Sequence, residues 1–72
     1  MPRYRFLPFR NEHDTNPLSM LTGNCTDFLE ARTRAKNAAE EAGAEFVAIE
    51  NDKGDITERW RFVDGDWRPF DA

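Results

Sequence analysis

The sequence is poor in cysteine and lacks long apolar runs, and each shortage excludes a class of protein. Its single cysteine, Cys25, can form no disulfide within the chain, which favours a reducing compartment. No run approaches the roughly 20 apolar residues of a membrane-spanning helix. The arginines near the N-terminus are not followed by the apolar segment of a secretion signal. We therefore expect a cytoplasmic protein that does not contact the membrane.

The residues that usually carry catalysis or bind metal ions are also scarce. The one histidine, His13, stands between Glu12 and Asp14 in a polar segment, and adjacent residues rarely converge on one ion. Cys25 precedes a predicted helix, where a thiol can become reactive, but no second cysteine accompanies it. We expect a buried or half-buried Cys25 that does not meet His13, no enzymatic activity, no metal and no cofactor.

The chain is acidic overall, and its basic residues are mostly arginines. The net charge is -4, which weighs against a protein that coats duplex DNA. Eight of the ten basic residues are arginines, and only Lys36 and Lys53 are lysines. An arginine bias suits planar recognition and stacking, and it is also typical of GC-rich genomes.

Small and large side chains are separated along the chain. Alanines recur at helical spacing (Ala31, Ala35, Ala38 and Ala42), whereas most aromatic residues lie in the flanking segments. Asp27 and Glu30 have the spacing of a helix N-cap and its reciprocal carboxylate, and Gly43 suits a left-handed C-terminal cap. The pattern predicts one helix over residues 27–42 whose small face allows close packing on a sheet.

The remaining segments predict a mostly antiparallel sheet of three to five strands within a single α+β domain, residues 1–72. The expected order is β-(β)-α-β-β-(β), with Tyr4 and Phe6 pointing inward from the first strand. Pro8 should end that strand or place it at a sheet edge, and Pro69 should confine the last strand to an edge. Residues 18–21 are either a strand that Gly23-Asn24 closes or an apolar plug from a loop. The other strands are expected at residues 3–9, 45–50, 56–63 and 67–70.

A turn centred on Lys53-Gly54 sets the expected register of the central hairpin. It pairs Val47 with Trp60, Ala48 with Arg59, and Phe46 with Arg61. Ile56, Trp60 and Phe62 then face the helix. The opposite face should collect arginines and one aromatic residue: Arg3, Arg5, Phe46, Arg59 and Arg61. Trp67 and Phe70 are further interaction candidates, and both also suit core lids.

Two sequence patterns resemble small uncharacterised bacterial domains. The opening Met1-Pro2-Arg3-Tyr4 followed by an alanine-rich helix resembles one group, and Ala42–Val47 followed by Lys53–Ile56 is similar to another of β-β-α-β-β architecture. The resemblance implies an α+β fold. It supplies neither an activity nor functional residues.

Composition and pattern together favour a small non-enzymatic protein-binding module. Self-association as a homodimer is its simplest form, because edge strands and terminal aromatics are easily shared between copies. A more specific form is an acidic inhibitor or adaptor, of the kind that phages and mobile elements encode, which binds a basic surface of a host protein. The alternative is a single-stranded nucleic-acid binder that uses the arginine-rich sheet face.

Overall fold

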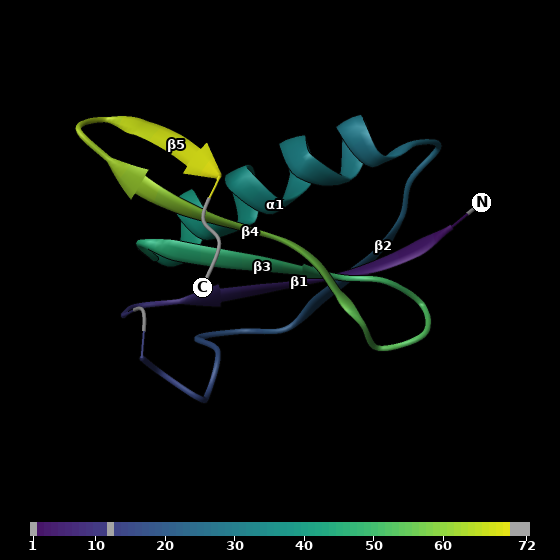
Figure 1. Ribbon diagram of the computed structural model, residues 1–72, viewed down its shortest axis with the longest axis horizontal. Helices are drawn as coiled ribbons and strands as arrows, with labels where there is room; N and C mark the ends of the chain where they lie inside the picture. The colour runs from purple at the N-terminus through teal and green to yellow at the C-terminus, as the bar shows by residue number, and fades with distance from the viewer. Residues whose placement is uncertain (1, 12, 70–72) are drawn as a thin grey trace.

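The computed structural model, which describes residues 2–11 and 13–69, shows one helix on one face of a five-stranded antiparallel sheet (Figure 1). The sheet order is β2-β1-β3-β4-β5. The elements are β1 (Arg3–Phe9), β2 (Leu21–Asn24), α1 (Phe28–Ala42), β3 (Phe46–Glu50), β4 (Ile56–Val63) and β5 (Asp66–Pro69). The expected α+β class and order of elements are confirmed.

The two ends of α1 are formed by the predicted capping residues. Asp27 Oδ1 accepts a hydrogen bond from Glu30 N at 2.9 Å. The Glu30 carboxylate accepts in return from Thr26 N at 3.0 Å, one residue earlier than a standard capping box requires. Gly43 ends the helix in the left-handed conformation, with φ 69°. Its missing Cβ makes this conformation inexpensive.

The core lies between the small face of α1 and the large side chains of the sheet. Ala31, Ala35 and Ala39 are fully buried and Ala38 nearly so. Ala42 was expected on this face but is exposed, because steps of four residues align Ala39, not Ala42, with Ala31 and Ala35. Facing them are sheet residues that include Phe6, Val47, Ile49 and Trp67.

The expectation that Pro8 ends β1 or marks a sheet edge is wrong. β1 runs on to Phe9 and lies between β2 and β3. The Pro8 carbonyl accepts from Leu18 N at 2.7 Å, on the side away from β3. The N–H and C=O groups of a strand residue point to the same side, so the N–H that Pro8 lacks would also have pointed away from β3. On that side the pairing of β1 with β2 ends at Phe6, so the proline interrupts neither strand ladder.

The second strand lies later in the sequence than expected. It begins at Leu21 and runs through Gly23 and Asn24, while Leu18 and Met20 precede it and are exposed. A Cβ on Gly23 would lie 3.1 Å from Arg34 Nη1, the movable end of an exposed side chain, and at an ordinary 3.5 Å from the Phe6 ring. The predicted closing residues therefore belong to the strand itself.

The central hairpin has the predicted register: Val47 pairs with Trp60, Ala48 with Arg59, and Phe46 with Arg61. A bulge between Ile49 and Glu50 then shifts the pairing, so that Ile56 lies opposite Glu50. This shift moves Ile56 to the face away from the helix, contrary to expectation, because an extra residue reverses the alternation of side chains beyond it.

The last two strands are joined by the predicted tight turn. Asp64 and Gly65 both have positive φ, 51° and 79°. These values fit a two-residue hairpin turn. As expected, β5 is an edge strand.

Candidate binding surface on the free face of the sheet

We call the side of the sheet away from α1 the free face. The register places most of its side chains in three rows that run across the strands. The first row holds Phe9, Phe46, Arg61 and Arg68, the second Leu7, Ala48 and Arg59, and the third Arg5, Glu50 and Ile56. Apolar residues of β1 and β3 therefore occupy the middle of this face, and arginines of β4 and β5 lie beside them.

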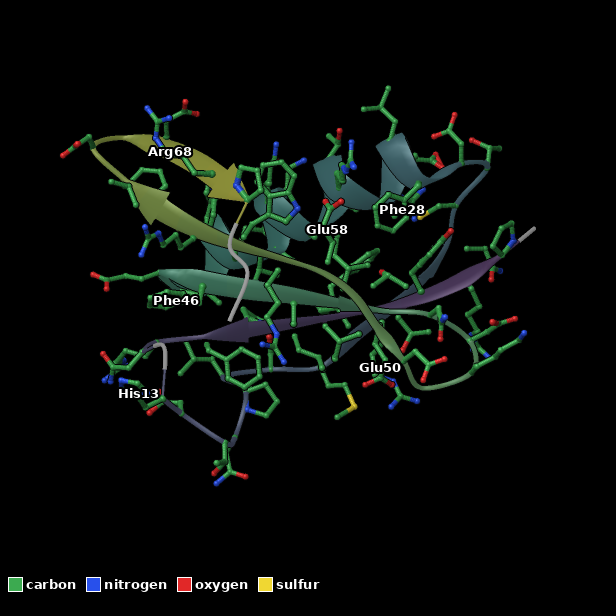
Figure 2. The ribbon with its side chains drawn as sticks, viewed as in Figure 1. His13, Phe28, Phe46, Glu50, Glu58 and Arg68 are labelled. Carbon is green, nitrogen blue, oxygen red and sulfur yellow. The ribbon has the colours of Figure 1, made fainter. Side chains whose placement is uncertain are left out.

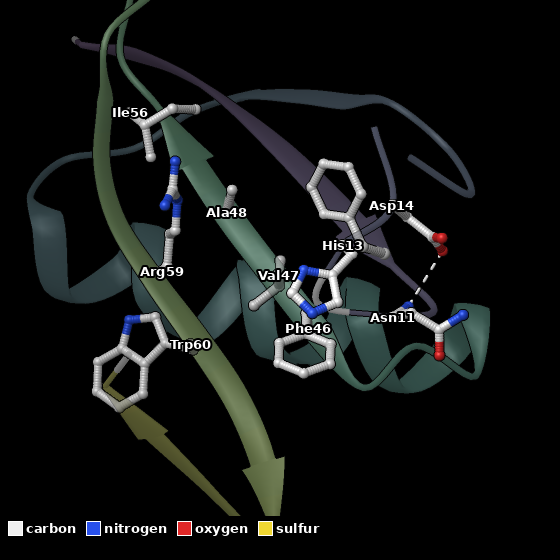
Figure 3. Close-up of a pocket in the computed structure, with 10 residues that line it drawn as sticks. Asn11, His13, Asp14, Phe46, Val47, Ala48, Ile56, Arg59 and Trp60 are labelled. Carbon is white, nitrogen blue, oxygen red and sulfur yellow. Dashed lines mark hydrogen bonds between the residues drawn. The ribbon is translucent and has the colours of Figure 1, made fainter. Parts of the chain in front are cut away.

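A hollow of about 380 Å³ lies on the free face, over β3 and between β4 and the segment that follows β1 (Figure 3). Phe9, Phe46, Ala48 and Ile56 give it mostly apolar walls, and Arg59 borders it on β4. Ala48 makes room for the hollow, because the side chains on either side of it in β3, Phe46 and Glu50, are larger. The hollow is large enough to admit an apolar side chain from another molecule.

The segment after β1 closes one side of the hollow. Asn11 N donates to Asp14 Oδ2 at 3.1 Å, and Asp14 N donates to Asn11 O at 3.2 Å, which fixes a tight turn. The turn places His13 at the edge of the hollow that Phe46 also lines (Figure 3). The rim therefore offers an imidazole and a guanidinium across the hollow from each other, with one carboxylate behind the imidazole.

The free face is rich in arginine, and its acidic residues are few. The register assigns to it Arg3, Arg5, Arg59, Arg61 and Arg68. Arg5 is held by Glu50, with Nη1 and Oε1 3.0 Å apart. Arg61 and Arg68 are direct cross-strand partners on this face.

The five residues predicted for this face do lie on it, but the structure does not unite them in one cluster. Phe46, Arg59 and Arg61 lie beside or near the hollow. Arg3 and Arg5 instead line a separate polar depression beside the turn of residues 51–54. The strands are long enough to keep these two groups at opposite ends of the sheet. The proposed role of the five residues in binding stays a prediction.

Of the two aromatic interaction candidates near the C-terminus, Trp67 is among the described residues. Trp67 is buried to 9% exposure, packs edge-on against Phe62 and donates from Nε1 to Glu40 at 3.2 Å. It thus corresponds to the core-lid alternative. Phe70 lies outside the described residues.

His13 and Cys25 lie on opposite sides of the sheet. His13 lines the hollow on the free face, whereas Cys25 is fully buried in the core on the helix side. Burial raises the pKa of the Cys25 thiol, and the nearby Arg34 opposes this rise. The described residues contain no group of three His, Cys, Asp or Glu side chains that could hold a metal ion; Glu12 is not among those residues.

Sequence reasoning missed a second polar cluster, on the helix side of β4. The Arg32 guanidinium lies over the rings of Phe28 and Trp60, at 5.0 and 5.8 Å. It also donates to both carboxylate oxygens of Glu58, at 2.8 and 2.7 Å, and this bonding raises the pKa of Arg32. Lys36, one turn after Arg32 on the same helix face, also lies over Trp60, with Nζ 4.1 Å from the ring centroid. Figure 2 shows Phe28 and Glu58 on the helix side of β4 and His13 and Phe46 on the far side of the sheet.

This cluster fastens α1 to β4. Glu58 also accepts from Trp60 Nε1, so its oxygens have partners already. The cluster residues are four apart on the helix and two apart on the strand. This spacing could have revealed the cluster only once the two elements were known to pack together. The free-face hollow is the better candidate for binding another molecule.

No family model, no curated protein and no solved structure matches this chain. Within the described part of the chain, no helix has the length and apolar character needed to cross a membrane.

Proposed function

We propose that the chain is a non-enzymatic protein-binding module whose free face receives an acidic segment of a partner protein. The observation that supports this is the hollow, which has apolar walls and the Arg59 guanidinium at its rim. An apolar side chain of the partner would enter the hollow, and neighbouring carboxylates would pair with the arginine. Such central apolar anchors with charged surroundings are the usual arrangement of a protein interface.

The positive charge of this face also distinguishes between the expected kinds of binding module. The net charge of -4 suggests an adaptor or inhibitor that docks on a basic host surface. The arginines are gathered on the free face, however, so a partner that binds there is better matched if it is acidic. An adaptor or inhibitor would then act by masking an acidic segment of its target.

Peptides of defined charge test the proposal. The probes are short peptides in which one leucine or phenylalanine lies between glutamates, and matched peptides in which lysines replace the glutamates. Binding is followed by amide chemical shifts in the ¹⁵N-labelled protein. We expect the acidic peptides to shift Phe46, Ala48 and Arg59, and the lysine peptides to leave these amides unchanged.

A matched pair of variants locates the site. Arg59→Glu is expected to weaken binding of the acidic peptide by about tenfold, since it replaces an attraction at the rim by a repulsion. Arg3→Glu makes the same change of charge at the far end of the same face and is expected to have little effect. Equal losses in both variants, or no shifts with any acidic peptide at millimolar concentration, would refute the proposal.

A single-stranded nucleic acid is the second candidate for this face. Phe9 and Phe46 are cross-strand partners beside the arginines, and aromatic residues on a sheet can stack bases. The mostly apolar walls of the hollow favour the protein partner, because they suit an apolar side chain better than a charged nucleic-acid backbone. A labelled oligonucleotide at low salt decides: salt-sensitive binding that Arg59→Glu abolishes would assign the face to nucleic acid instead.

A further inference from the structure

The two edges of the sheet differ in how well they are protected against pairing with another strand. The edge strand β5 contains Asp66, Arg68 and Pro69 among its four residues. The other edge strand, β2, has the sequence Leu-Thr-Gly-Asn, without a charge or a proline. Charged residues and proline are the common means by which proteins keep edge strands from associating. The β2 edge lacks both.

Exposed apolar side chains gather beside this same edge. Leu18, Met20 and Leu21 are 41%, 59% and 42% exposed. Among the described residues, they are half of the large hydrophobic side chains that are exposed; the others are Leu29, Ile56 and Phe62. Every residue from Thr15 to Thr26 is uncharged, in a chain of which 33% is charged. Low charge, exposed apolar groups and an open strand edge therefore coincide.

The pairing of β2 with β1 determines which backbone groups point outward. Cys25 N donates to Pro2 O at 3.0 Å, so Cys25 directs its backbone toward β1. Alternate residues of an antiparallel strand point to opposite sides. Gly23 and Leu21 therefore also face β1, and Thr22 and Asn24 present their N–H and C=O groups at the outer edge.

This arrangement is complementary to itself. A second copy placed antiparallel about a two-fold axis at Gly23 brings Thr22 of each copy opposite Asn24 of the other. Each such pair can exchange two N–H···O hydrogen bonds. The same register runs residues 18–21 of one copy toward the start of α1 in the other, where Leu29 is 67% exposed.

We propose that β2 is a homodimer interface, through which two copies join their sheets edge to edge. Two molecules that each carry a net charge of -4 repel one another, and contact through the uncharged segment 15–26 brings the least charge to the junction. The isologous pairing is the one that a two-fold axis requires. Because the axis is perpendicular to the sheet, both free faces lie on the same side of the dimer.

Light scattering coupled to size-exclusion chromatography tests the dimer. We expect a mass twice the 8.4 kDa of the chain at high concentration and dissociation on dilution. Thr22→Lys introduces a charge at the edge and is expected to weaken the dimer by about tenfold or more. Thr33→Lys makes the same change on the exposed side of α1 and should leave the dimer intact.

Thr22→Pro is a second, independent variant. Its backbone nitrogen faces outward, so proline removes a hydrogen bond to the second copy but none to β1. Circular dichroism checks that both variants remain folded. A monomer at all concentrations, or a dimer that persists in both Thr22 variants, would overturn the proposal. If the chain is a monomer and its β2 amide signals shift only when extended peptides are added, the edge binds another protein and not a second copy. Neither assay uses the acidic peptides, so the two proposals can fail separately.

Discussion

The alanine face of α1 sets the distance between helix and sheet, and Ala35→Leu tests whether that distance is as short as the structure indicates. Ala35 is 0% exposed and belongs to the core cluster. If the core had room, burying the three added carbon atoms would stabilise the fold by about 0.8 kcal/mol each. Without room, overpacking costs about 1–3 kcal/mol. The hollow on the free face offers no space here, because the sheet lies between it and α1. We therefore expect destabilisation.

This loss is large for a chain of 72 residues. At about 0.05–0.15 kcal/mol per residue, the whole free energy of unfolding is about 4–11 kcal/mol. A loss of about 2 kcal/mol would lower the Tm by about 8–16 °C in a domain of this size. Urea and thermal unfolding followed by circular dichroism measure both quantities.

Ala42→Leu is the matched control. It makes the same substitution in the last turn of the same helix, where the side chain is exposed, and should change stability by no more than about 0.5 kcal/mol. If Ala35→Leu proves as stable as Ala42→Leu, the argument that small side chains bring the helix close to the sheet is wrong.

Two further predictions concern the polar cluster and the buried thiol. Glu58→Ala is expected to destabilise the fold by about 0.5–1.5 kcal/mol in urea unfolding, because Arg32 and Trp60 Nε1 both lose their acceptor while the partly exposed Arg32 can turn to water; a change below the error of measurement would mean that water replaces the carboxylate at no cost. The second follows from the pKa of Cys25, which burial raises above the value of the unfolded chain. Above the ordinary thiol pKa, the unfolded state releases a proton that the native state retains. The thiol therefore contributes its full stabilisation below the ordinary pKa, and this contribution is lost as the pH rises through the raised pKa of the native state. Urea unfolding at neutral and alkaline pH should show a steeper alkaline loss of stability in the wild type than in Cys25→Ala, and equal slopes would contradict the burial of this thiol.

Caps and turns were predicted correctly because they depend on residues that are adjacent in the sequence. Asp27 and Gly43 delimited α1, and the turn at Lys53-Gly54 gave the register of the central hairpin. The bulge at Ile49/Glu50 was missed because nothing in the alternation of residues 56–63 announces an inserted residue. The position of Pro8 depended on where β2 stops pairing, which is a property of another strand.

The candidate site was only half predictable for the same reason. Alternation placed Phe46 and Arg59 on the free face. The wall that completes the hollow comes from Asn11, His13 and Asp14, in a polar segment without periodicity. Its course is fixed by the short turn between Asn11 and Asp14 and by its contact with the sheet, neither of which a hydrophobic pattern encodes.

The sheet order has a consequence for how the chain assembles. β1, β2 and α1 form one sequence-local half, and β3, β4 and β5 form another; the pairing of β1 with β3 is the only strand ladder that joins them in the described chain. That ladder unites residues about forty positions apart, so closing the intervening loop, not forming the hairpins, is expected to limit the folding rate. Gly43 lies at the boundary between the halves and is exposed. A chain divided there leaves two fragments, each of which carries one side of the missing ladder, and this makes the domain a natural candidate for a split reporter whose signal depends on two pieces finding each other.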